Sequence, residues 1–302
     1  ALVWFEKSLK LRREIGDVRG IASALHVISI TKRMLGDYDV SGKALEESLA
    51  LRRQLDEPRG LSDSLYQISV RARNKGSYTE AIDYLKESLD LRRRTGDARG
   101  LGDDLINLGI CYTLTGQYEL ASQTLFESLT LRRAMDNQRG EASCHNAIGE
   151  LNLIRGQAGI ALRHFGLSLD IWQDKADRWN IANCHASVGY AQARAREVYS
   201  ARHHLHEGLE ISQRISALFI VLKSLIGWAQ LKLHEQQDYQ AAILLGAVDH
   251  HPAMTAQLRQ VYFDPVIEKL DLTRYAAEYE MGATSDLQGL IKLTLTQAKQ
   301  YF

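Results

Sequence analysis

Hydrophobic residues recur every three or four positions through most of the chain, in segments of helical length. In residues 101–115, for example, Leu105 and Leu108 would share one face of a helix. A second segment of this kind covers residues 118–135, and Gly116 lies between the two. Glycine readily adopts the left-handed conformation that ends a helix. The pattern therefore predicts a pair of antiparallel helices joined by a tight turn.

This helix pair is one copy of a unit that recurs every 40 residues. An Arg-Gly dipeptide begins at Arg19, Arg59, Arg99 and Arg139. A Leu-Arg-Arg tripeptide begins at Leu11, Leu51, Leu91 and Leu131. Turn glycines are expected at Gly36, Gly76, Gly116 and Gly156. One antiparallel pair cannot bury its apolar face alone, so neighbouring units must stack, and the repeat predicts an all-α array.

The third unit carries a family signature. Leu108-Gly109 places a small residue in the first helix, and Ala121 places another in the second, with Tyr112 between them. This order and spacing resemble the tetratricopeptide repeat (TPR), although the period is 40 residues rather than the usual 34. The resemblance implies a right-handed TPR-like solenoid. Residues 1–251 would form the array, as half a unit followed by about six helix hairpins.

The 40-residue period is lost toward the C-terminus. Three further helical segments are predicted there, at 254–270, 272–279 and 285–299. We expect Pro265 to interrupt the first of them and Gly282 to separate the other two. A repeat array needs a terminal element that covers its last apolar face. We therefore assign residues 252–302 to a C-terminal helical cap.

The C-terminal segments also carry a resemblance of their own. They run from Ala241–Ala247 (AAILLGA) through Tyr275–Gly282 (YAAEYEMG) to a helix that begins near Thr284. This order resembles the end of TPR sensor regions in bacterial STAND-type signal-transduction NTPases, including MalT-like and LuxR-type transcriptional regulators. The resemblance implies a sensor that binds a peptide, a protein or a small inducer and restrains an upstream ATPase module. The chain has no initiator Met and begins within a helical pattern, which favours a fragment of a larger regulator.

Composition narrows the classes of function. Lys and Arg number 37 and Asp and Glu number 37, whereas direct nucleic-acid binding usually needs a basic surplus. The longest apolar run, Ala217–Leu222, has six residues, far short of the ~20 that cross a bilayer. The three cysteines form no disulfide framework, which favours a reducing compartment. We therefore expect a cytoplasmic protein with neither a membrane span nor a nucleic-acid site in this segment.

The sequence contains no catalytic motif. P-loop, Gly-x-Ser-x-Gly, His-Glu-x-x-His and Cys-x-x-Cys patterns are all missing, so we predict neither an enzyme nor a cofactor. Cys144-His145 and Cys184-His185 suggest zinc, but they occupy equivalent positions of neighbouring units. Stacked helices lie about 8–10 Å apart, whereas zinc ligands lie within ~2.3 Å of the metal. Repeat duplication is the favoured explanation, and we predict no metal site.

The Leu-Arg-Arg series has two interpretations. It could form a phosphate-binding ladder, but Glu47 and Glu87 accompany the arginines at equivalent positions. Mixed charge of this kind is typical of the outer face of an array, and we favour a structural role. The linker arginine is expected to cap the preceding helix or to pair with Asp17, Glu57 or Asp97.

The TPR resemblance implies that a ligand contacts polar positions on the first helix of each unit, which line the concave groove. Asn, Arg and Tyr suit such positions because they hydrogen-bond an extended peptide. The candidate ligand-binding residues are Tyr66, Arg73, Asn74, Asn107, Asn146, Glu150, Asn183, Tyr190 and Arg194. The alternative for any one of them is a solvated surface position. The sequence thus predicts a non-enzymatic sensor region for a peptide, protein or small inducer, and a standalone adaptor for protein–protein interaction is the alternative.

Overall fold

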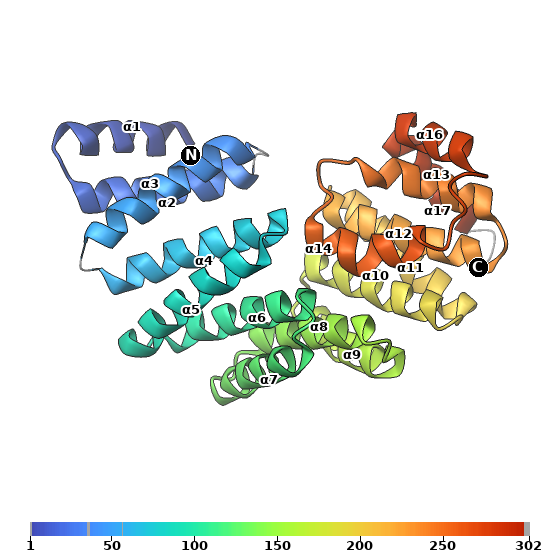
Figure 1. The fold of residues 1–302 in the computed structure, drawn as a ribbon, viewed down its shortest axis with the longest axis horizontal. Helices are drawn as coiled ribbons and strands as arrows, with labels where there is room; N and C mark the ends of the chain where they lie inside the picture. Colours follow the sequence, from blue (N-terminus) through green and yellow to red (C-terminus); the bar gives the residue numbers. More distant parts are fainter. Residues whose placement is uncertain (1, 35–36, 56, 299–302) are drawn as a thin grey trace. The chain divides into compact units, whose positions relative to one another are not determined.

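The computed structural model describes residues 2–34, 37–55 and 57–298. These residues form helices in a repeated arrangement and contain no β-strand, which confirms the predicted fold class. The chain divides into two compact units, called unit 1 (Ala1–Thr115) and unit 2 (Gly116–Phe302), and Figure 1 colours it from blue to red along the sequence. In the described part of the chain, no helix is long and apolar enough to cross a membrane.

Unit 1 consists of helices that alternate between the two positions of the repeat. They are α1 (Leu2–Glu14), α2 (Val18–Met34), α3 (Tyr38–Gln54), α4 (Pro58–Lys75), α5 (Tyr78–Thr95) and α6 (Ala98–Leu114). Helices α2, α4 and α6 are the first helices of successive repeats. The helix predicted at 101–115 is α6, which begins three residues earlier because Asp97 caps it by accepting a hydrogen bond from the Gly100 N–H. One core cluster of this unit consists of Leu45, Leu49, Leu65 and Ile68.

Unit 2 continues the same alternation. Its repeat helices are α7 (Tyr118–Ala134), α8 (Gln138–Ile154), α9 (Ala158–Asp174), α10 (Arg178–Arg194), α11 (Val198–Arg214), α12 (Leu218–His234) and α13 (Asp238–Asp249). Here α8, α10 and α12 are the first helices. The helix predicted at 118–135 is confirmed as α7. Small residues allow close packing within each pair, since a Cβ added to Gly189 on α10 would lie 2.7 Å from Leu205 on α11.

The turns between consecutive helices contain residues in the left-handed conformation. Gly116 has a φ of +76°, as predicted, and Gly76 has +86°, whereas Gly36 lies outside the described residues. Several turns of unit 2 use other residues in this conformation, such as Ala176 with a φ of +52° and Arg196 with +63°. A side chain there costs about 1–2 kcal/mol. Packing of the flanking helices therefore imposes this geometry where glycine is missing.

The first arginine of the Leu-Arg-Arg group folds back against the Arg-Gly linker that follows it. In unit 1, a Cβ added to Gly100 would overlap the guanidinium of Arg92. In unit 2, Arg132 lies against Gly140 in the same way. Glycine is needed in these linkers because an arginine side chain occupies the space of its missing Cβ. Arg92 and Arg132 are buried, so the outer-face interpretation is wrong for this first arginine.

The second arginine of the group does lie on the outside. Arg13 pairs with Glu47 at 2.6 Å and Arg53 pairs with Glu87 at 3.0 Å, which joins the second helices of successive repeats. These pairs confirm the structural interpretation of the mixed charge. The linker Arg19 lies 3.7 Å from Glu57 of the next linker. Asp17 and Asp97 were also expected to pair with a linker arginine. They pair instead with the first arginine of the Leu-Arg-Arg group, Asp17 with Arg12 and Asp97 with Arg92.

The C-terminal region begins with short helical turns inside unit 2. They are α14 (Ala256–Leu258), the π-helical turn η1 (Arg259–Phe263) and α15 (Asp264–Ile267). We call residues 256–267 the inner segment; it packs against α12, and Figure 1 shows it in orange beside that helix. Pro265 lies in the first turn of α15, where its missing N–H is tolerated, so the irregularity lies just before the proline and not at it.

Of the last two helices, the one predicted at 285–299 is confirmed and the one before it differs from the prediction. They are α16 (Ala276–Thr284) and α17 (Leu287–Ala298), so the helix expected at 272–279 begins and ends later. Gly282 lies within α16 and does not separate two helices, and the expectation that it would is wrong. A Cβ added there would overlap the Ile243 carbonyl on α13. The glycine therefore allows α16 to pack closely on α13, the last helix of the array.

Candidate functional site

In unit 1, three of the predicted ligand-binding residues form one network across α4 and α6. Arg73 Nη1 donates to Asn107 Oδ1 at 2.8 Å, and Asn107 Nδ2 donates to the Tyr66 hydroxyl at 3.3 Å. Burial raises the pKa of Tyr66, so its hydroxyl stays protonated at neutral pH. Asn74 follows Arg73 on α4 and is half-buried. The structure thus brings Tyr66, Arg73 and Asn107 together.

A cavity of about 280 Å³ lies beside this network, within unit 1. Tyr66 lines it together with His26 of α2, Asp63 of α4 and Asp103 of α6. The Asp63 side chain is 54% exposed. Burial, and then the charge of Arg52, lowers the pKa of His26 to about 4, so this ring is neutral at pH 7. The cavity therefore offers carboxylates, a phenol and a neutral imidazole to a ligand.

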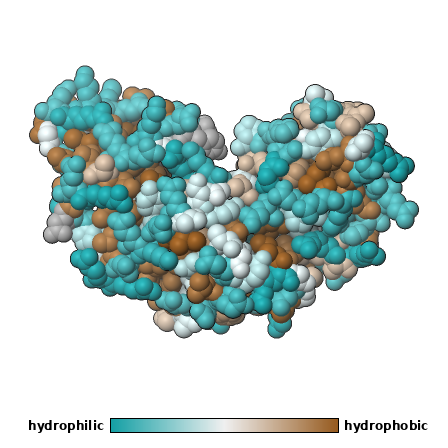
Figure 2. Space-filling view, in the orientation of Figure 1, coloured by the Kyte–Doolittle hydropathy of each residue, from teal (hydrophilic) through white to brown (hydrophobic). Residues whose placement is uncertain are grey.

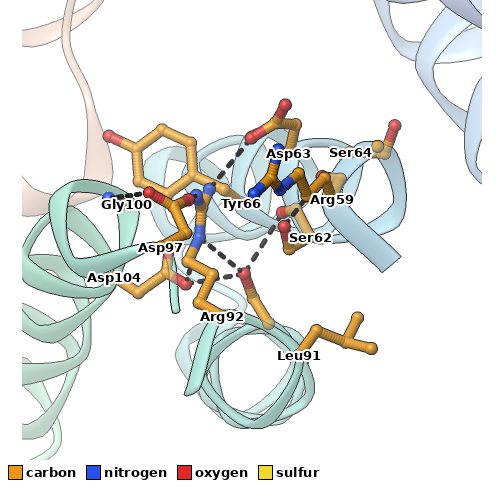
Figure 3. Close-up of polar contacts among 12 residues, drawn as sticks. Arg59, Ser62, Asp63, Ser64, Tyr66, Leu91, Arg92, Asp97, Gly100 and Asp104 are labelled. Atoms are coloured by element: carbon orange, nitrogen blue, oxygen red, sulfur yellow. Dashed lines mark hydrogen bonds and ion pairs between the residues drawn. The ribbon is translucent and has the colours of Figure 1, made fainter. Parts of the chain in front are cut away.

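The buried guanidinium of Arg92 organises one side of the cavity (Figure 3). It contacts Asp63 at 3.1 Å and Asp104 at 2.9 Å, and it also bonds to Asp97. Asp104 is fully buried and accepts a further hydrogen bond from Ser88 at 2.6 Å. Because one arginine joins three carboxylates from α4, α6 and the linker, it fixes the orientation of Asp63 at the cavity. The repeat pattern had placed this arginine on the outer face.

In unit 2, the corresponding predicted residues contact the chain's own inner segment. The Tyr262 hydroxyl donates to Glu150 Oε1 at 2.9 Å, and the Tyr190 hydroxyl donates to the Tyr262 carbonyl at 3.0 Å. Gln257 Nε2 donates to the other Glu150 oxygen at 2.8 Å. Tyr190 is 0% exposed, and burial raises its pKa. The inner segment thus occupies the part of this face where Glu150 and Tyr190 lie.

Lys223 of α12 is the centre of the same cluster. Its Nζ donates to Asn183 Oδ1 at 3.1 Å and to Ser187 Oγ at 2.6 Å, and it lies 3.6 Å from Glu150 Oε1. The ammonium also lies 4.3 Å from the centroid of the Tyr262 ring. Burial lowers the pKa of Lys223, and the carboxylate of Glu150 opposes that shift. Lys223 is 0% exposed, which is rare for a charged side chain and requires the polar partners that surround it.

The two remaining predicted residues lie at the margin of this cluster. Arg194 is half-buried and donates to the Leu153 carbonyl at 3.5 Å. Asn146 is also half-buried, and its Oδ1 has no hydrogen-bond partner. The structure therefore brings Glu150, Asn183 and Tyr190 together in a buried cluster and leaves Asn146 and Arg194 more accessible.

The two Cys-His pairs do not converge on one point. Cys144 Sγ donates to Ser128 Oγ at 3.3 Å, whereas His145 Nδ1 lies 3.0 Å from His164 Nδ1. The next repeat reproduces this arrangement, with a distance of 2.9 Å between His185 and His204. Each cysteine and its neighbouring histidine thus have separate partners. In the ranges that the structure describes, the group with the spacing of metal ligands is His206, Glu207 and Glu210 on α11, which the sequence did not indicate.

Comparison with known proteins supports the repeat. Residues 64–134 match the family model described as "Tetratricopeptide repeat". No curated protein matches the sequence.

Several solved structures have a similar fold. A Rap protein complexed with Competence and Sporulation Factor aligns with a TM-score of 0.65 and 11% identity, over 100% of this chain and 86% of that one. The apo form of RapI aligns with a TM-score of 0.60 and 13% identity, over 90% of this chain and 98% of that one. BtubC (BKLC) from P. vanneervenii aligns with a TM-score of 0.58 and 16% identity, over 71% of this chain and 91% of that one. At these identities the likeness shows the solenoid fold alone, and the resemblance to STAND-type regulators stays a prediction.

Proposed function

We propose that this chain is a non-enzymatic sensor region that binds a peptide or protein segment on the first helices of unit 1. The observation that carries this proposal is the Tyr66–Asn107–Arg73 network beside an open cavity of about 280 Å³. In unit 2, by contrast, the inner segment covers Glu150 and Tyr190. An external ligand therefore finds accessible polar groups in unit 1.

The chemistry of this face suits an extended peptide. The half-buried Arg73 can donate hydrogen bonds to backbone carbonyl groups, and the half-buried Tyr66 ring provides a flat apolar contact, while the buried Asn107 holds these two side chains in place. Asp63 lies at the cavity with a partly exposed carboxylate that can accept from a donor on the ligand. The TPR match and the similar Rap protein complexed with Competence and Sporulation Factor support a protein or peptide as the partner.

We further propose that the chain belongs to a larger, cytoplasmic bacterial regulator of the STAND type. In that setting, ligand binding would favour one packing arrangement of the helices and so release or engage an upstream ATPase module. A small inducer in the same groove would act by the same route. A standalone adaptor would use the same face without an attached module, so the response of the parent protein's ATPase rate to the ligand separates the two functions.

The binding proposal can be tested with peptides selected from a random library on the full chain. We expect Arg73→Ala and Tyr66→Phe to weaken the selected peptides by at least about 10-fold, since each loses a hydrogen bond near 1.4 kcal/mol. Arg53→Ala is the matched control, because it removes a partly exposed arginine from a second helix of the same unit. Peptides whose affinity is unchanged by Arg73→Ala and Tyr66→Phe would contradict the proposed site.

A further inference from the structure

A second cavity of about 280 Å³ lies within unit 2, between α12, α13 and α17. Its walls are largely apolar and include Trp228 of α12, Ile243 of α13 and Leu290 of α17. Leu293, which is 54% exposed, lies at the surface beside it. Figure 2 shows hydrophobic surface in the region where Figure 1 draws α12 and α13. None of the residues predicted to bind a ligand lines this cavity.

Two side chains of α12 that carry donors, Trp228 and Lys232, line the cavity. Trp228 is 2% exposed, and its Nε1–H has no acceptor among the residues that the structure describes. Lys232, one turn further along α12, also lines the cavity and donates to Gln237 Oε1 at 2.8 Å. Within the described ranges Gln240 Oε1 has no partner either, while its Nε2 donates to the Tyr239 hydroxyl. Rotating this amide by 180° lets Oε1 accept from Tyr239 and presents Nε2 as a further donor.

The charge of the lining is positive. Lys232 contributes an ammonium, and none of the described residues that line the cavity is Asp or Glu. The nearest acid to Lys232 is Glu235, at 3.7 Å, and this carboxylate also bonds to Arg202. Burial lowers the pKa of Lys232 and Glu235 acts in the opposite direction, so a second carboxylate in the cavity would stabilise the ammonium further. The buried indole N–H of Trp228 also lacks an acceptor within the described part of the chain, and leaving such a donor unpaired is unfavourable.

We propose that this cavity binds a small amphipathic carboxylic acid, whose carboxylate accepts from Trp228 and pairs with Lys232 while its hydrocarbon body lies between α13 and α17. Trp228 and Lys232 are four residues apart and so lie on one face of α12, within reach of the same group. The volume is near the lower end of small-molecule sites, about 300–1,000 Å³. A medium-chain acid therefore fits better than a long one. This site is independent of the peptide site proposed for unit 1.

The test uses octanoate as the probe and the full chain labelled with ¹⁵N at tryptophan. We expect the indole N–H signal that Trp228→Phe removes to shift saturably, while the signals of Trp4, Trp172 and Trp179 stay in place. Trp228→Phe keeps an aromatic ring but loses the donor, and we expect octanoate to bind at least about 10-fold more weakly, as a hydrogen bond to a charged group predicts. No shift at millimolar octanoate would overturn the proposal.

Two further comparisons identify the role of charge. Lys232→Met keeps an apolar side chain of similar length, and we expect it to weaken octanoate about 10-fold and to leave the neutral octan-1-ol unaffected. Lys175→Met, at an exposed position after α9, is the matched control. If Lys232→Met does not fold, Leu293→Trp serves in its place, since a larger residue at the exposed edge should obstruct entry. The proposal would be overturned if Trp228→Phe bound octanoate as tightly as the parent chain and the second variant, Lys232→Met or Leu293→Trp, did so too.

Discussion

Units 1 and 2 are built from the same repeat, yet their first helices present different surfaces. In unit 1, Tyr66 and Asp63 border an open cavity. In unit 2, the inner segment covers the equivalent face and buries Val261, Phe263 and Val266. Each such side chain contributes about 1.5–3 kcal/mol when buried. The difference shows that a repeat sets the packing of an array, whereas a segment outside the repeat decides which part of its face remains available.

The cluster around Lys223 has a different role from these apolar contacts. A buried ion pair gains little net stability, because desolvation of both charges offsets their attraction. Lys223 and Glu150 are joined by Asn183, Ser187 and Tyr262, which meets most of their hydrogen-bonding demand. The apolar residues of the inner segment therefore hold it in place, and the polar cluster determines the register in which it docks.

The largest expected effect on stability comes from removing a side chain of the inner segment that covers the first helices of unit 2. Tyr262→Ala removes a buried ring and leaves Glu150 and Lys223 without their aromatic neighbour, and we expect it to lower the free energy of unfolding by about 3–5 kcal/mol. Tyr66→Ala is the matched change in unit 1, where the ring is half-buried, and it should cost about 1 kcal/mol. Urea unfolding followed by circular dichroism measures both. Equal losses would contradict the distinction between a covered and an open face.

A smaller effect is expected from the linker glycine. Gly140→Ala places a methyl group against Arg132, and we expect a loss of about 1–3 kcal/mol from overpacking. The equivalent residue of the next repeat is Asn180, where Trp172 replaces the arginine. Asn180→Ala should therefore change stability by less than about 0.5 kcal/mol. Thermal unfolding of the two variants gives the comparison, and a Gly140→Ala protein as stable as the parent would show that Arg132 can move aside.

Asp104 predicts a pH dependence that originates in unit 1. Burial raises the pKa of this carboxyl to about 7 from an ordinary value of 3.8, with Arg92 acting in the opposite direction. Between pH 4 and 7 the native chain therefore holds a proton that the unfolded chain releases, so the stability from this group falls as pH rises. We expect Asp104→Asn to flatten that decline, by about 1–2 kcal/mol over the window.

The measurement is the free energy of unfolding at several pH values between 4 and 7, with Asp83→Asn, at an exposed position of α5, as the control. His185 in unit 2 should produce the opposite slope. Burial lowers its pKa to about 4, so the unfolded chain binds the extra proton and stability rises with pH between 4 and 6.5. His26 adds a slope of this second kind within unit 1, which is why each variant is compared with the parent chain. A steeper decline in Asp104→Asn would contradict the assignment.

The smallest effect concerns the turns. Ala176→Gly should stabilise unit 2 by about 0.4–1 kcal/mol, since glycine takes a positive φ without the strain of a Cβ. Gly96→Ala in unit 1, at a φ of +69°, should destabilise by a similar amount. If both variants changed stability in the same direction, the backbone conformation would not be what determines the stability of these turns. Thermal unfolding resolves differences of this size.

The helices of the array were predictable because they have a regular apolar face and several of them end at a turn glycine, as α6 does at Gly116. The placement of Gly282 inside a helix was not predictable. In a single sequence, a glycine that ends a helix cannot be distinguished from one that allows two helices to pack closely. Arg92 was missed for a similar reason. Its position in a charged repeat indicated solvent, and its fit against Gly100 becomes evident only in three dimensions.

The candidate site was predictable in part. The resemblance to TPR proteins selected Tyr66, Arg73 and Asn107, which the structure joins in one network. It also selected Glu150 and Tyr190, but nothing in the repeat indicated that the inner segment would lie on them. That contact joins residues more than 70 positions apart, as in the bond from Tyr190 to Tyr262. Periodicity describes neighbouring repeats and carries no information on a partner so distant in the chain.

The packing of arginine on glycine has a consequence for how such arrays can be shortened or recombined. Arg92 belongs to one repeat of the sequence, whereas Gly100 and Asp104 belong to the next. A junction placed in the linker between α5 and α6 would separate this arginine from Asp104 and from the glycine that it packs against, whereas Asp63 on α4 would stay on its side of the junction. The exchangeable module is therefore a second helix together with the first helix that follows it, offset by half a period from the repeat that the sequence displays.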